Sequence, residues 1–418
     1  MRLLPKLLIT AVLLALLVVS AYQSPSIQRS LSWRVDIVLT YLRGLIYPAN
    51  QMPTPLPQPA VGITVRPTAT TAPVASIPPQ NTTPEPTLPP TPTPTPLPPS
   101  HSLPSPAWEK QDINNCGPAS LAMYLRFYGW EGDQFDIANL LKPKREDRNV
   151  NVEELDYYVR TRVGWLNTLY RVGGNIDLLR RFVAAGIPVM IEEGFYVEDT
   201  FWPNDDHWAG HYLLITGYDD AAQSFIGQDS FRGADQRVSY QSVKKNWQAF
   251  NYVYILIYLP TQSKTVQSIL SILGDEWNVD INRQHALDLA RAETEADPQN
   301  AFAWFNLGTN LVYFEQYGEA ARAYDMARKL GLPQRMLRYQ FAPFFAYFFS
   351  GRIDELMALT QYALQRTPNS EEAWLWQGWG YYRQGEKAKA LASFQKALEM
   401  NPSYQDAHYA LDFVRENP

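Results

Sequence analysis

The sequence predicts an α+β domain followed by an all-α repeat solenoid, with a non-globular stretch in front of both. Three observations predict this organisation. Helix patterns precede strand patterns between residues 107 and 260, which is the order of an α+β domain. Small residues and prolines recur every 34 positions within residues 261–418. Residues 51–106 are rich in Pro and Thr and have no means of forming a hydrophobic core.

The first 21 residues predict a signal peptide or a membrane anchor. Arg2 and Lys6 precede the apolar run 7–19, which is short for a membrane-spanning helix of about 20 residues. Because the basic residues come before the run, we expect the rest of the chain to lie outside the cytoplasm, either secreted or tethered to the membrane. The sequence leaves open whether the segment is cleaved.

Two further segments separate this N-terminus from the first domain. Residues 22–50 are amphipathic, and they predict either an interfacial helix beside a membrane or a short helix packed on another part of the protein. Residues 51–106 favour polyproline II and predict a semi-rigid, disordered spacer. The net charge of −6 over 418 residues does not indicate a protein that binds nucleic acid.

The first domain, residues 107–260, shows helix signals and then strand signals. We expect helices over 119–129, 131–141, 151–160 and 175–185, and strands over 187–191, 211–218, 224–229 and 251–259. The two middle strands are separated by a short turn, so they predict an antiparallel hairpin.

Cys116 is the only cysteine of the chain, and it stands at the start of the first predicted helix. Pro118 suits the first turn, and Gly129 suits the end of this helix. At a helix N-terminus the dipole and the free N–H groups favour a thiolate, so Cys116 is a candidate nucleophile. The alternative is that Cys116 is a buried, inert small hydrophobe.

Other polar residues of the domain supply the remaining parts of a cysteine-dependent site. Of the five histidines, only His207 and His211 share a domain with Cys116. His211 opens a strand and would act as general base and acid, and the hairpin would bring Asp229 beside it to orient the ring. Gln111, five positions before Cys116, would donate to an oxyanion. Each of these residues taken alone is more simply interpreted as a surface polar group or a strand-end cap, and it is their combination around Cys116 that favours a catalytic site.

A metal site competes weakly with this interpretation. Asp205, Asp206, His207 and His211 crowd together, but the strand that follows argues against a helix that would direct both histidines to one ion. We therefore predict neither a metal nor a cofactor. The loop over residues 192–206 is expected either to line a substrate cleft or to be a solvated surface loop.

Residues 261–418 show the repeat. Gly351, Ala363 and Pro368 lie 34 positions before Gly385, Ala397 and Pro402. An earlier unit runs from Trp304 to Pro333, and a half-unit over 283–298 is expected to cap the stack. This part resembles the tetratricopeptide repeat family, which implies a scaffold that binds a peptide or protein partner.

The first domain also resembles a known family. Gln-x4-Cys-Gly-Pro at 111–118, Gly-His-Tyr at 210–212 and Gln-Asp-Ser at 228–230 are similar to the papain-like cysteine peptidases related to the bacteriocin-processing, double-glycine-leader (C39-like) peptidases. The resemblance implies a papain-like fold in which Cys116 is the nucleophile, His211 the base, Asp229 the orienting carboxylate and Gln111 an oxyanion donor. Many relatives have Asp-Pro where this chain has Asp229-Ser230.

Together these features predict an exported cysteine peptidase that hydrolyses peptide bonds through a thioester. The repeats would recruit the peptide or protein substrate, or another protein partner. Two other functions stay open: a catalytically silent peptidase fold used for binding, and a cell-surface scaffold based on the repeats, with a binding face formed by aromatics such as Trp374, Trp376, Trp379 and Tyr381. Transpeptidation or amidase action would use the same chemistry.

Overall fold

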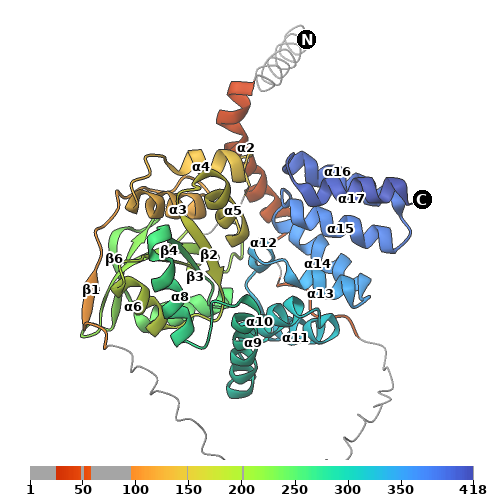
Figure 1. Ribbon diagram of the computed structural model, residues 1–418. Helices are drawn as coiled ribbons and strands as arrows, with labels where there is room; N and C mark the ends of the chain where they lie inside the picture. The colour runs from red at the N-terminus through yellow and green to blue at the C-terminus, as the bar shows by residue number, and fades with distance from the viewer. Residues whose placement is uncertain (1–24, 49–50, 58–95, 148, 200–201, 418) are drawn as a thin grey trace, which may run out of the picture. The chain divides into compact units, whose positions relative to one another are not determined.

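The computed structural model describes residues 25–48, 51–57, 96–147, 149–199 and 202–417 (Figure 1). The predicted signal or anchor segment, residues 1–21, lies outside the described residues, as does most of the predicted spacer. The described residues up to Pro55 and from Leu97 onwards belong to one compact unit, which is separate from Leu56–Pro96. Among the described residues, no helix is both long enough and apolar enough to cross a bilayer.

An antiparallel sheet of seven strands forms the centre of the first domain. Six strands follow the order β2-β7-β3-β4-β5-β6, and β1 pairs with β4. The strands are β1 (Ser100–Ser102), β2 (Asn167–Arg171), β3 (Val189–Tyr196), β4 (Trp208–Asp219), β5 (Ser224–Asp229), β6 (Gly233–Ser239) and β7 (Tyr254–Tyr258). The predicted hairpin is confirmed as β4 and β5, and the bounds of β5 are those predicted.

Three less apolar strands of this sheet, β1, β2 and β6, were not among the strands predicted from the sequence. Strand β1 lies inside the segment predicted to be a spacer, where Ser100 pairs with Asp219. Strands β2 and β6 were not predicted, because their alternation of apolar and polar side chains is weak and β6 is largely exposed. Main-chain hydrogen bonding along a strand needs no apolar pattern, so such strands form once a neighbour is in place.

Helices cover both faces of the sheet (Figure 1). Alternate residues of β4 point to opposite faces: Tyr212 and Leu214 pack into one hydrophobic cluster, and Leu213 and Ile215 into another. The helices of this domain are α3 (Cys116–Phe127), α4 (Gln134–Leu141), α5 (Val152–Arg162), α6 (Ile176–Ala184) and α7 (Tyr240–Trp247). Helices packed on a single antiparallel sheet confirm the α+β class, although β1 and β2 precede some of these helices and α7 lies between β6 and β7.

The second part of the chain is entirely helical, as predicted. Its helices are α8 (Ser263–Ile272), α9 (Val279–Ala296), α10 (Ala301–Tyr313), α11 (Tyr317–Leu330), α12 (Met336–Tyr339), α13 (Ala342–Phe349), α14 (Ile353–Arg366), α15 (Glu371–Arg383), α16 (Lys387–Met400) and α17 (Gln405–Glu416). Helices α10 and α11 pack as one pair, and α15 and α16 pack as another. Gly308 allows α10 to approach α11 closely, because a Cβ at this position would lie 2.8 Å from the Tyr324 ring. In the unit between these pairs, Phe344 takes the glycine position and is fully buried.

Two of the four aromatic residues that the sequence suggested for a binding face, Trp376 and Trp379, pack against neighbouring helices instead. The Trp376 side chain is only 7% exposed and packs against Phe345 and Phe348 of α13. Trp379 packs against Phe394 and Phe413 of the following helices. These side chains fill the space between neighbouring repeats, which is the usual use of large side chains in such stacks.

The amphipathic segment before the spacer is a helix, α2 (Pro25–Ile46). Apolar side chains recur on it every three or four residues, and many are exposed to 40% or more: Leu31, Val35, Val38, Leu39, Leu42, Leu45 and Ile46. That spacing places most of them along one side of the helix.

Candidate active site

Helix α3 begins at Cys116, with Asn115 as its N-cap residue. The Cys116 side chain is half-buried. It lies at the helix N-terminus, where the first backbone N–H groups have no carbonyl partner within the helix. Gly129, with φ of +90°, follows the helix as predicted. The local sequence therefore places a thiol at the N-terminus of a helix, beside free backbone N–H groups.

A buried lysine fastens the loop that leads to Cys116. The Lys142 ammonium donates to the carbonyl oxygens of Ile113, Asn114 and Asp147 at 2.9–3.3 Å. Asn114 has a φ of +51°, a conformation that the loop must hold against its local preference. Burial lowers the pKa of Lys142, and nearby negative groups, Asp147 and Cys116 first, oppose that shift. Lys142 thus fixes the loop and adds positive charge beside the thiol.

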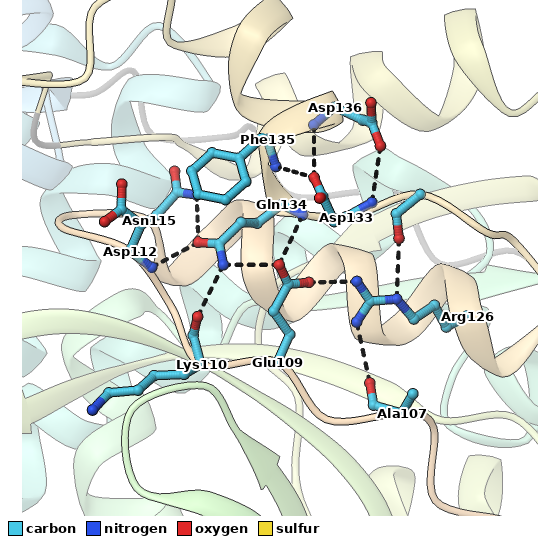
Figure 2. Close-up of polar contacts among 11 residues, drawn as sticks. Ala107, Glu109, Lys110, Asp112, Asn115, Arg126, Asp133, Gln134, Phe135 and Asp136 are labelled. Atoms are coloured by element: carbon cyan, nitrogen blue, oxygen red, sulfur yellow. Dashed lines mark hydrogen bonds and ion pairs between the residues drawn. The ribbon is translucent and has the colours of Figure 1, made fainter. Parts of the chain in front are cut away.

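Figure 2 shows a second set of contacts that holds the same loop, centred on the buried side chain of Gln134 in α4. Its carbonyl oxygen accepts from the Asp112 N–H and from the Asn115 side chain, both at 2.7 Å. Its amide nitrogen donates to Glu109 at 2.8 Å, and Glu109 pairs with Arg126 of α3. Because these bonds join the loop to two helices, they hold the backbone that leads into α3 in one conformation.

The hairpin of β4 and β5 brings His211 and Asp229 together. The Nε2 atom of His211 lies 3.0 Å from Oδ1 of Asp229, and both side chains are almost fully buried. The same Asp229 oxygen accepts from the backbone N–H groups of Phe231 and Arg232 at 2.8 and 2.9 Å. With Nε2 directed to Asp229, Nδ1 is the other ring nitrogen, and the interaction of His211 with Cys116 is seen in the raised pKa of the imidazole.

The charges of this group favour an ionised pair. Burial lowers the pKa of His211, but hydrogen bonds to Asp229 and Cys116, and the negative charge of both, outweigh burial and raise the pKa to about 10. Burial would raise the pKa of Asp229, but His211 and the two backbone donors hold it below its ordinary value. His211 is therefore a cation and Asp229 an anion at neutral pH.

Strand β3 supplies the surroundings of the imidazole. The Phe195 ring lies 4.8 Å from the His211 ring, between centroids, and Arg232 lies over the Phe195 ring. Glu193 stands directly opposite His211 in the register of β3 and β4. Its side chain is buried, and among the described residues its Oε2 atom has no hydrogen-bond partner. Burial raises the pKa of Glu193 to about 7, and the charge of His211 opposes that rise.

Gln111 is joined to the residue that follows Asp229. The backbone N–H of Gln111 donates to the Ser230 carbonyl oxygen, and the Ser230 hydroxyl donates to Oε1 of Gln111, both at 2.9 Å. Ser230 is fully buried. Because Oε1 is held by this hydroxyl, the Nε2 atom of Gln111 is the end of the amide that remains to donate to a ligand.

The crowded acidic and histidine residues before β4 have other contacts. Asp205 pairs with Arg335, and Nδ1 of His207 lies 3.0 Å from the Val197 carbonyl oxygen. Within the described ranges, no group of three or more His, Cys, Asp or Glu side chains is arranged to hold a metal ion. The predicted loop 192–206 is also shorter than expected, because residues 192–196 extend β3 into the core.

The structure therefore brings the sequence-predicted residues into one place. His211 is bonded to Asp229, its pKa is raised by Asp229 and Cys116, and Gln111 is bonded to Ser230. Sequence reasoning did not find Lys142 or Glu193. The only signal for Glu193 was its position in the loop 192–206, which was expected either to line a substrate cleft or to be a solvated surface loop.

Comparisons with known proteins identify the families of the two parts of the chain. Residues 101–255 match the Peptidase_C39 like family, and residues 371–404 match the tetratricopeptide repeat family. The chain therefore combines a C39-like peptidase domain, with a papain-like α+β fold, and tetratricopeptide repeats. No curated protein matches the chain in sequence.

Several solved structures each resemble somewhat more than a third of the chain. A C39-like peptidase from Bacillus anthracis is 20% identical over 38% of this chain and 96% of its own, with a TM-score of 0.31. A double glycine motif protease from an AMS/PCAT transporter, in complex with its leader peptide, is 14% identical over 38% and 94%, with a TM-score of 0.28. MamA from Desulfovibrio magneticus RS-1 is 15% identical over 37% and 83%, with a TM-score of 0.30.

Proposed function

We propose that this protein is a cysteine peptidase that hydrolyses peptide bonds, and that its repeats recruit the substrate or a protein partner. One observation carries the proposal: a buried histidine is bonded to the carboxylate of Asp229, and its pKa is raised by that carboxylate and by the helix-terminal Cys116. A fold that only binds has no need of a buried cation between a thiol and a carboxylate, because burying such charges is costly.

In the first step the Cys116 thiolate attacks the carbonyl carbon of the scissile bond. The carbonyl oxygen becomes an oxyanion, for which the Cys116 N–H and the Gln111 amide are the donors. His211 then gives its proton to the leaving amine, the C–N bond breaks and a thioester remains on Cys116. Asp229 keeps the imidazole oriented and stabilises its charged form.

In the second step His211 accepts a proton from water, and the resulting hydroxide attacks the thioester. The thiolate leaves, the acid product departs and His211 is again protonated beside Cys116. Each oxyanion donor of this kind is worth about 10²–10³ in kcat in peptidases, so the orientation of Gln111 matters to the rate.

The test measures the reactivity of Cys116 in the full-length chain. We expect iodoacetamide to alkylate wild type rapidly near pH 6, where an ordinary thiol of pKa about 8.5 is almost entirely protonated. His211→Ala should remove this low-pH reactivity. His408→Ala is the matched control, because His408 lies in α17 of the repeats and its ring is bonded to the Pro402 carbonyl oxygen, and it should behave as wild type.

Hydrolysis is then measured with a library of peptides, with Cys116→Ser as the inactive control. Slow alkylation of wild type at pH 6, equal to that of His211→Ala, would refute the peptidase proposal and favour a silent binding module or a repeat scaffold. An activated thiol whose acyl group passes to added amines rather than to water would identify a transpeptidase instead.

We also propose that the chain is exported and held at a membrane by its N-terminus. The charge and apolar pattern of residues 1–21 supports this, and so does the exposed apolar side of α2. We expect the full chain in the membrane fraction, with its C-terminal domain digested by protease added outside intact cells. Recovery in the cytosolic fraction, protected from protease, would refute this proposal.

A further inference from the structure

The loop that leads to His211 is held by the repeats. Residues 202–208, here called the histidine loop, end at the start of β4, three positions before His211. Asn204 and His207 both have a φ of +60°, which is unfavourable for a histidine. A loop with this backbone needs outside contacts to keep its conformation.

Those contacts come from residues 334–339, here called the clamp segment, which include α12 between two repeats. The Arg335 guanidinium donates to the Trp208 carbonyl oxygen at 2.6 Å and forms an ion pair with Asp205. Both charged side chains are almost completely buried. A buried pair of this kind ties its two segments together, because moving either one leaves an uncompensated charge.

Gln334 makes three further hydrogen bonds between the clamp segment and the histidine loop. The Gln334 N–H donates to Oδ2 of Asp206 at 2.7 Å, and the Gln334 side chain donates to the Asn204 carbonyl oxygen at 3.0 Å. Trp202 donates its indole N–H to Oε1 of Gln334 at 3.2 Å. The histidine loop is thus bonded to the clamp segment along most of its length.

Gly210, the residue before His211, also packs against the clamp segment. A Cβ on Gly210 would lie 2.8 Å from Phe250 and 3.1 Å from Tyr339, so Gly210 lies directly against the clamp segment. The Trp208 ring packs on Tyr339 and on Phe302 of α10. Repeat side chains therefore form part of the support under the start of β4.

We propose that the clamp segment is a positioning element for His211, with Arg335 as its central residue, so that the peptidase site is competent only while the repeats are folded against it. The catalytic meaning of this inference rests on the proposed function. Any partner that moves α12 would then change the geometry of His211, which connects the repeats to the chemistry.

The test compares full-length variants in two measurements. Arg335→Met removes the guanidinium and retains much of the side-chain length. Arg352→Met is the matched control, because Arg352 forms its ion pair with Asp325 inside the repeats. We expect Arg335→Met to lower the rate of Cys116 alkylation near pH 6 by roughly 10- to 100-fold, the scale for small displacements in an active site. Arg352→Met should retain the wild-type pH profile.

Backbone hydrogen exchange supplies a readout that needs no active thiol. Arg335→Met should speed exchange of the amides from Asp205 to His211 while the amides of α3 stay as in wild type. If Arg335→Met does not fold, Asp206→Asn removes one loop contact more gently and should give the same local increase. Unchanged exchange of this loop in a folded variant overturns the inference.

The two proposals fail in different ways. If wild-type Cys116 is not activated, the peptidase function is wrong, while loop exchange still decides whether the clamp segment holds the loop. If wild type is activated and Arg335→Met shows the same alkylation profile, the peptidase proposal stands and the positioning role is refuted.

Discussion

Glu193 offers a sharp test of the electrostatics around His211. Its carboxyl is buried opposite the imidazole, and burial raises its pKa from an ordinary 4.5 to about 7. The folded state therefore holds this proton more tightly than the unfolded state does. The stability that the protonated form contributes is fully present below pH 4.5 and is lost as the pH rises through 7.

The size of the effect follows from that difference. A pKa difference of about 2.5 between the folded and unfolded states corresponds to about 3 kcal/mol of unfolding free energy. Glu193→Gln has no such proton to lose. The unfolding free energy of this variant, relative to wild type, should therefore increase by about 3 kcal/mol between about pH 4 and pH 8.5.

The assay is urea unfolding of both full-length proteins across this pH range, followed by tryptophan fluorescence. Glu198→Gln is the control, because Glu198 is an exposed glutamate just beyond β3. Its difference from wild type should stay within about 0.5 kcal/mol at every pH, as for most surface substitutions. A Glu193→Gln difference that is equally flat would refute the reasoning that burial keeps this carboxyl protonated.

Three further outcomes are expected. Because the pKa of His211 is raised to about 10, peptidase activity should persist through pH 8 to 9 and fall as His211 loses its proton near pH 10; a fall near pH 6.5 in the pH–rate profile would contradict the ion pair. Ser230→Ala frees Oε1 of Gln111, so kcat should fall by roughly 10-fold or more with unchanged alkylation of the thiol, and equal loss of both would point to misfolding. Gly378→Ala drives a methyl group into Phe394 and should lower the unfolding free energy by about 1–3 kcal/mol in thermal or urea unfolding; a neutral variant would mean that the helix pair has room.

Much of the site could be predicted because its signals are local. Cys116 precedes an apolar periodic segment with Pro118 and Gly129 at suitable positions, so the helix N-terminus could be located from the sequence. The short turn between two strand patterns predicted a hairpin, and the antiparallel register then placed Asp229 near His211. The repeat period likewise identified helix pairs before any contact was known.

Other features depend on contacts between distant segments, for which the sequence gives no local signal. The sequence predicted that Glu193 lies in a loop, and only the pairing of β3 with β4 sets it against His211. Strand β1 was predicted to be spacer, because its ladder with β4 is made by backbone groups of ordinary polar residues.

The sequence by itself determined the α+β class, the repeat array and the candidate residues Cys116, His211 and Asp229, because helix periodicity, turn chemistry and motif spacing act over short distances. Only the tertiary structure decided that Ser230 orients Gln111 and that Arg335, over a hundred positions from the histidine loop, holds that loop. Such contacts arise from packing between segments far apart in the chain, where burial makes a charge or hydroxyl depend on a partner that neighbouring residues do not specify.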